Sequence, residues 1–135
     1  MFRGVLEEHG GVKIIGIDTI THVDEEDAGH IVLSASHGGT SAGSYGLKYP
    51  LAAVFFNDAG VGKDNAGIAA LSMLEAAGIP GGTYSHMTAR IGDVRDSWEN
   101  GVISHINDAA RKMGFRQGEP VKVALRRVAK AKANK

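Results

Sequence analysis

Hydrophobic residues along this chain fall into short continuous runs separated by longer stretches of helical spacing. Apolar runs rich in β-branched and aromatic side chains predict four strands, over residues 12–17, 31–36, 51–56 and 79–85. The third run is the most continuous, which is typical of a strand that is covered on both faces. The fourth is weaker, because Pro80-Gly81-Gly82 interrupts it.

Apolar residues at helical spacing predict helices between and after these strands. The expected ranges are 42–48, 66–77, 93–113 and 121–133. Gly78 and Gly114 follow two of the helices directly, as glycine often does at a helix C-terminus. The apolar face of the longest helix would consist of Trp98, Val102, Ile106, Ala109 and Met113.

The repeated order of strand, loop and helix predicts an α/β fold. We expect a single three-layer domain over residues 1–135, with about four mainly parallel strands flanked by helices. Residues 121–135 would form a basic C-terminal helix with a frayed end. Residues 18–30 are near the lower length limit for a parallel crossover, so the first two strands could be either parallel or antiparallel.

Composition narrows the class of protein. The chain has 43% hydrophobic and 22% charged residues, an ordinary globular balance. Its 15 basic and 15 acidic residues give zero net charge, so we expect neither nucleic acid nor membrane as a partner. Cysteine is absent, which excludes disulfides and thiolate chemistry. Because no apolar signal core or membrane-length run occurs, we expect a cytoplasmic protein.

Polar, glycine-rich segments directly follow the predicted strands. They cover residues 18–21, 36–41, 57–64 and 85–93. In a parallel sheet the carboxyl ends of the strands meet at one edge, where ligands bind. The sequence thus predicts a single site made from these four segments.

The predicted catalytic residues are His37, Asp58 and His86. A histidine at a strand end is suited to general acid/base chemistry near neutral pH. Asp58 follows the most apolar strand, so its carboxylate needs a partner, for which His37 or Lys63 is the natural candidate. The predicted substrate-binding residues are Ser36, Gly38, Gly39, Asn57, Gly60, Lys63 and Arg90.

Each of these segments also has a purely structural interpretation. Gly38-Gly39 could make a tight turn, and Asn57 and Asp58 could cap the next one. Asp93 could orient Arg90 or His86, or cap the following helix.

No cofactor is predicted. The run Gly60-Val61-Gly62-Lys63 is not a phosphate-binding loop, because Asp64 stands where a Ser or Thr is required. A divalent metal is an alternative, with His37, Asp58, His86 and Asp93 as ligands from separate loops. The remaining histidines are expected to be structural or exposed: His9, His22, His30 and His105.

These features favour a small-molecule enzyme. The His/Asp site would carry out acid/base chemistry (hydrolysis, elimination or isomerisation) on a small, polar, anionic carbonyl substrate. One alternative is a binding or regulatory module that holds an anion or small ligand without chemistry. A second is an interaction subunit, with the Trp98 face in a homo-oligomer interface.

Overall fold

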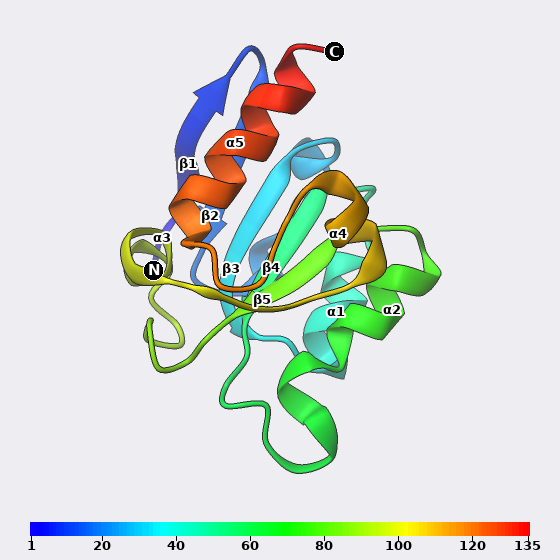
Figure 1. Cartoon of the computed structure of the whole chain (residues 1–135), viewed down its shortest axis with the longest axis vertical. Helices are drawn as coiled ribbons and strands as arrows, with labels where there is room; N and C mark the ends of the chain where they lie inside the picture. Colours follow the sequence, from blue (N-terminus) through cyan, green and yellow to red (C-terminus); the bar gives the residue numbers. More distant parts are fainter.

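The computed structural model describes residues 1–135 and is built on one six-stranded sheet between two layers of helices (Figure 1). The strands cross the sheet in chain order. They are β1 (Arg3–His9), β2 (Val12–Ile17), β3 (Ile31–His37), β4 (Ala53–Asn57), β5 (Gly81–Tyr84) and β6 (Ile103–Ile106). β2 to β5 pair in parallel, whereas β1 and β6 are antiparallel to their neighbours at the two edges.

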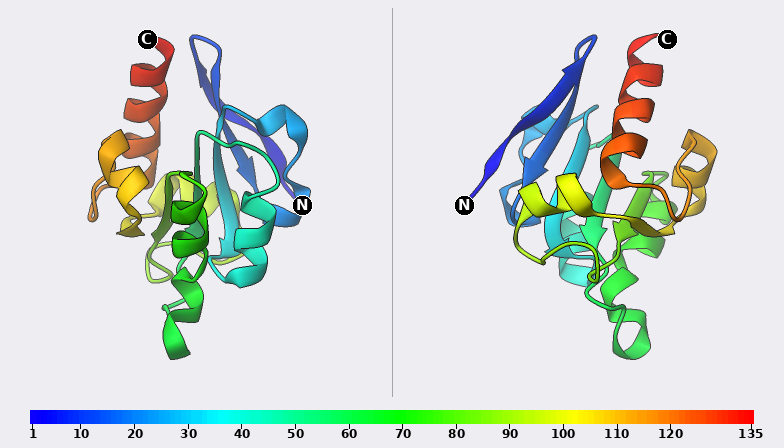
Figure 2. Two further views of the ribbon diagram at one scale, coloured as in Figure 1. Left: turned by 90° about the vertical axis from the view of Figure 1, so that its right-hand side faces the viewer. Right: turned by 60° about the vertical axis from the view of Figure 1, so that its left-hand side comes forward.

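The helices form two layers, one on each face of the sheet (Figure 2). On one face lie α1 (Thr40–Gly46), α2 (Ala70–Ala76) and the short 3₁₀ segments η1 (Ile20–His22), η2 (Glu25–Asp27) and η3 (Lys63–Ile68). On the other lie α3 (Val94–Asn100), α4 (Asp108–Met113) and α5 (Val121–Ala133).

β4 shows why the central strands read as continuous apolar runs. All five of its residues are buried. Phe56 belongs to the core beneath α1 and α2, while Phe55 points to the opposite core. There its ring packs edge-on against Phe115, with 4.9 Å between the ring centroids. Because both faces are covered, neither side of the strand requires polar residues.

The expectation of about four strands is wrong, because it omits β1 and β6. Both are edge strands with polar sequences: β1 carries Arg3, Glu7 and Glu8, and β6 carries Ser104 and His105. An edge strand has one open side, so it does not need a continuous apolar run. The open question about the first two predicted strands is also settled, since β2 and β3 are parallel.

The predicted helix over 93–113 is wrong as well. α3 ends at Asn100, β6 follows, and α4 begins at Asp108. Gly101 leaves the helix with extended backbone, and its α-carbon packs so closely that a Cβ there would lie 2.6 Å from the Ser97 carbonyl oxygen. The face from Trp98 to Met113 is thus divided among three elements, and the homo-oligomer interface inferred from it loses its basis.

α2 and α5 agree better with the sequence patterns. The helix expected over 66–77 is the 3₁₀ segment η3 followed by α2. α5 spans Val121–Ala133 and buries Val121, Leu125 and Val128. Its Arg126 pairs with Glu7 on β1, so part of its charge is neutralised within the fold. None of the helices combines the length and apolar character needed to cross a membrane.

Candidate functional site

The parallel strands bring the four polar segments to the same end of the sheet, where β2 to β5 have their carboxyl ends. This region is called the edge below, and is distinct from the edge strands β1 and β6. His37 at the end of β3 is paired in register with Asn57 at the end of β4, and Asn57 with Tyr84 at the end of β5. Adjacent strands lie about 4.8 Å apart. The residues that follow β4 and β5 are thereby placed side by side, next to the end of β3.

Asn57 organises the loops at this edge. Its side chain is fully buried. The Nδ2 group donates to the Ala89 carbonyl at 3.0 Å, and Oδ1 accepts the Ala59 N–H at 2.8 Å. Asn57 therefore connects the segment after β4 to the segment after β5, and its predicted part in substrate binding stays a prediction.

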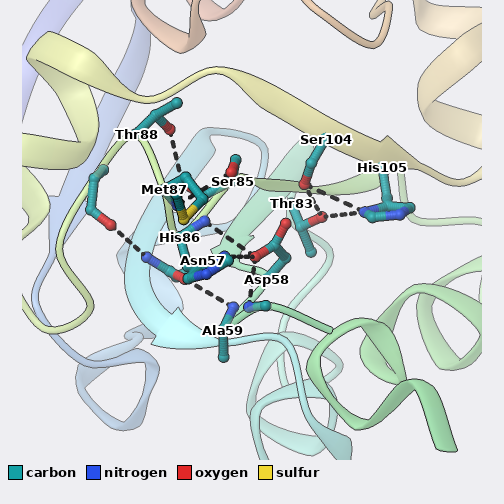
Figure 3. A network of polar contacts seen from close by, with 12 residues as sticks. Asn57, Asp58, Ala59, Thr83, Ser85, His86, Met87, Thr88, Ser104 and His105 are labelled. Atoms are coloured by element: carbon teal, nitrogen blue, oxygen red, sulfur yellow. Dashed lines mark hydrogen bonds and ion pairs between the residues drawn. The ribbon is translucent and has the colours of Figure 1, made fainter. Parts of the chain in front are cut away.

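Asp58 and His86 contact one another at the ends of β4 and β5 (Figure 3). Asp58 is only 4% exposed. Its Oδ1 accepts the Gly60 N–H at 2.8 Å and the His86 backbone N–H at 3.0 Å, and lies 3.3 Å from His86 Nδ1. The expected partner, His37 or Lys63, is wrong, because the loop after β5 delivers both the backbone and the ring of His86 to this oxygen.

The surroundings of Asp58 keep its carboxylate ionised. Burial by itself would raise the pKa of Asp58. The Gly60 and His86 N–H groups, together with the nearby Ser104 hydroxyl and the charge of His86, lower it by more than burial raises it. The pKa of Asp58 therefore lies below its ordinary value. An ionised carboxylate only accepts hydrogen bonds. The carboxylate therefore favours a proton on the facing Nδ1 of His86, which leaves Nε2 as the free nitrogen.

His86 remains accessible although Asp58 is buried. Its side chain is 47% exposed. The ring lies over Gly60, where a Cβ would come within 3.3 Å of the imidazole Cε1. Gly60 also has a φ of +75°. Gly60 thus allows the imidazole to approach closely, and its predicted part in substrate binding stays a prediction.

His37 occupies a separate part of the edge. It is exposed and lines a pocket of about 400 Å³ between the ends of β2 and β3 and helix α1. Its ring packs against Gly39, where a Cβ would lie 2.8 Å from Nε2. Thr21, Ser41 and Tyr45 provide further hydroxyl groups in this pocket. His37 and Asp58 therefore do not form the pair expected from the sequence.

Ser36, Gly38 and Gly39 mainly hold the edge together. The Ser36 Oγ accepts the Ile20 N–H at 2.9 Å, which anchors η1. The Gly38 N–H donates to the Asn57 carbonyl at 3.0 Å, so it is not available to an oxyanion. Gly39 is the N-cap residue of α1.

The two predicted substrate-binding cations are both on the surface. Lys63 is exposed at the start of η3 and takes part in no ion pair. The Arg90 side chain is 83% exposed, with Nε 3.9 Å from Asp96. Asp93 caps α3 by accepting the Asp96 N–H, which is the structural one of its possible roles.

One part of the site, made by β5 and β6, is not anticipated by the sequence patterns. Thr83 and Ser104 form a hydroxyl pair at 3.0 Å beside Asp58, and His105 Nδ1 lies 3.2 Å from the Ser104 oxygen. Gly101 followed by the β-branched residues Val102 and Ile103 is the signal that could have predicted strand β6.

Asp18, in the predicted segment 18–21, accepts the Phe2 and Val94 N–H groups and joins β2 to α3.

No three histidine or acidic side chains of the chain lie close enough together to hold a metal ion. Comparison of the chain with protein-family models, curated proteins and solved structures finds no match. Functional conclusions depend on the geometry of this edge.

Proposed function

We propose that the chain is an enzyme that transfers protons on a small, polar carbonyl compound at the carboxyl edge of its sheet. His86 is the catalytic residue that takes up and returns the proton, and Asp58 positions it. The observation that supports this most is the buried Asp58 carboxylate, which holds the backbone N–H and the ring Nδ1 of the half-exposed His86.

The geometry fixes which nitrogen of the His86 ring faces Asp58. With Nδ1 directed to Asp58, Nε2 is the basic nitrogen and is free to reach a substrate. General acid/base catalysis of this kind contributes roughly 10²–10⁴-fold in rate.

Proton transfer fits the neighbouring hydroxyl groups better than covalent hydrolysis does. Ser85 Oγ accepts the Met87 N–H at 3.1 Å, and Thr88 Oγ1 donates to the Ser85 carbonyl at 2.7 Å. Neither is bonded to His86, so neither forms the nucleophile–base pair of a serine hydrolase. Elimination or isomerisation next to a carbonyl needs no such pair.

A binding module without chemistry is the second candidate. The pocket beside His37 favours it, because about 400 Å³ suits a small ligand and the wall offers several hydroxyl groups. In this case the ligand would leave unchanged, and His86 would not affect its affinity.

Exchange of the methyl protons of pyruvate in D₂O, followed by ¹H NMR, tests the proposal. Dihydroxyacetone serves as an uncharged second probe. We expect the protein to accelerate exchange, and His86→Ala to lose at least about 100-fold of that acceleration. Added imidazole should restore part of it. His9→Ala is the matched control, because His9 pairs with Glu7 on the β1–β2 hairpin at the opposite edge of the sheet.

Exchange that is equally fast in His86→Ala and the unaltered protein would refute the role of His86. A protein that binds either probe without accelerating exchange would favour the binding module. In that outcome, substitution of His37 should weaken binding while substitution of His86 should not.

A further inference from the structure

The pocket beside His37 lies between segments that are fixed to strand β3. Its volume is about 400 Å³, and its wall comes from residues 18–21 after β2, the end of β3, helix α1 and residues 91–92 after β5. The Ser36 Oγ accepts the Ile20 N–H at 2.9 Å, and the Gly92 N–H donates to the Ala35 carbonyl at 2.9 Å. These bonds hold the segments after β2 and β5 against β3. The pocket is therefore preformed, as small-molecule sites usually are.

Three polar side chains of this wall take part in no hydrogen bond or ion pair within the chain. They are His37 and Ser41, which are exposed, and Tyr45, which is half-buried. Serine and tyrosine hydroxyls and a neutral imidazole each donate and accept hydrogen bonds. A hydroxyl group on a ligand has the same two capacities. The wall therefore offers three groups that suit the hydroxyls of a ligand.

The charges of the wall do not suit an anion. The wall contains no lysine or arginine, and its one carboxylate is Asp18. Backbone N–H groups of Phe2 and Val94 hold this carboxylate in place, at 2.6 and 2.9 Å. Lys48 packs on the Tyr45 ring at 5.2 Å but is not part of the wall. Because sites for phosphate or carboxylate groups usually supply an arginine or a lysine, an uncharged ligand fits this pocket better.

Apolar side chains also line the pocket. Ile20, Ala35 and Ala42 are buried, whereas Ile91 from the loop after β5 is 55% exposed. A ligand that covers the Ile91 side chain removes apolar surface from water, which is favourable. The C–H groups on the face of a cyclic polyol provide such a cover, while its hydroxyls remain at the rim of the ring.

We propose that this pocket binds an uncharged cyclic polyol of monosaccharide size. His37, Ser41 and Tyr45 bond to its hydroxyl groups, and the Ile20 and Ile91 side chains pack against its C–H groups. The site is separate from the proton transfer at His86 and does not depend on it.

A ¹H–¹⁵N NMR titration of the whole chain tests the proposal. The probes are the methyl glycosides of glucose, galactose, mannose and ribose, which contain no carbonyl group and so cannot be substrates for the proposed proton transfer. We expect at least one of them to cause saturable shifts at millimolar concentration in residues 18–21, 36–45 and 91–92. Methyl glucuronide, which replaces the CH₂OH group of methyl glucoside with a carboxylate, should bind about 5-fold more weakly than methyl glucoside or worse.

Two conservative substitutions test the contacts with the ligand. Tyr45→Phe and Ser41→Ala should each weaken binding by roughly 3- to 10-fold, as expected for one lost hydrogen bond. Tyr49→Phe and Ser44→Ala are the matched controls and should leave binding unchanged, because neither residue lines the pocket and the Ser44 hydroxyl already donates to the Thr40 carbonyl. The proposal would be overturned if no glycoside shifts the pocket residues, if the glucuronide binds more tightly than the glucoside, or if the Tyr45 and Ser41 variants match their controls.

Discussion

Replacement of Asn57 by Asp is the sharpest test of how the edge is held together. The two side chains have the same shape, but the change replaces an amide donor with a carboxylate oxygen. That oxygen would lie about where Nδ2 now donates to the Ala89 carbonyl at 3.0 Å. A favourable contact becomes a repulsive one at a position with no exposure to solvent. The Ala59 N–H can still donate to the other oxygen.

Two contributions determine the size of the effect. The lost hydrogen bond leaves a buried carbonyl unsatisfied, which costs about 1–3 kcal/mol. Burial of the new carboxylate raises its pKa, and a rise of about 2 units costs roughly 3 kcal/mol at pH 7. The total of about 4–6 kcal/mol is a large part of a typical domain stability. For a domain of this size it lowers Tm by roughly 15–20 °C.

The loss should depend on pH in a definite direction. Because the pKa of the new carboxyl is raised in the folded state, the folded variant binds the proton more tightly than the unfolded chain does. The stability deficit relative to the unaltered protein is then small near pH 4 and grows as the pH rises through the folded pKa. A protonated Asp can also donate to the Ala89 carbonyl, which restores part of the original contact.

Urea unfolding at pH 4.5, 6 and 7.5 measures this deficit. Asn65→Asp is the matched control, because it introduces the same charge at an exposed position in η3. If Asn57→Asp at pH 7.5 is within 1 kcal/mol of that control, or if its deficit does not shrink at lower pH, then Asn57 does not hold the edge in the way described.

Two other substitutions test contacts described above. Gly67→Ala should destabilise the fold by about 2 kcal/mol or more in urea unfolding, because its Cβ would lie 1.8 Å from the Asp58 carbonyl oxygen, whereas Gly46→Ala, with its nearest neighbour at 3.4 Å, should be nearly neutral. Equal effects would contradict the close packing. Arg126 holds the pKa of Glu7 at about 2, below its ordinary value. The stabilising contribution of the Glu7 carboxylate to folding is therefore present above pH 4.5 and is lost as the pH falls toward 2. The stability difference between the unaltered protein and Glu7→Gln should narrow over that range, and a difference independent of pH would contradict the pairing; Glu8→Gln should show no such trend.

The sequence predicts the central strands well because their burial on both faces leaves a direct trace. The buried β-branched residues of β2 and β3 and the five buried residues of β4 form continuous apolar runs. β6 leaves no such trace. Trp98, Val102 and Ile106 recur at helical spacing, yet Trp98 is in a core on α3 and Ile106 is on a strand. This coincidence of spacing led to the prediction of one helix over 93–113, whereas α3 ends before Gly101 and β6 follows.

The site shows a similar limit. That Asp58 needs a partner follows from its position after a buried strand. Which histidine supplies it does not, since His37 and His86 flank the end of β4 from two different strands. The choice depends on the path of the loop after β5, which directs the His86 backbone N–H and ring to the same oxygen. Such a path is set by tertiary contacts, including the one from Asn57 to Ala89.

The strand order also has a consequence for synthesis on the ribosome. Each strand pairs only with its neighbour in sequence, so the sheet can grow in the order in which the chain emerges. The core under α5 is different, because Leu125 and Val128 pack with Ile14 and Leu33 from the first strands. The part of this face that α5 covers stays open until residues 121–133 have left the exit tunnel. Until then the chain exposes an apolar surface on which a chaperone can bind.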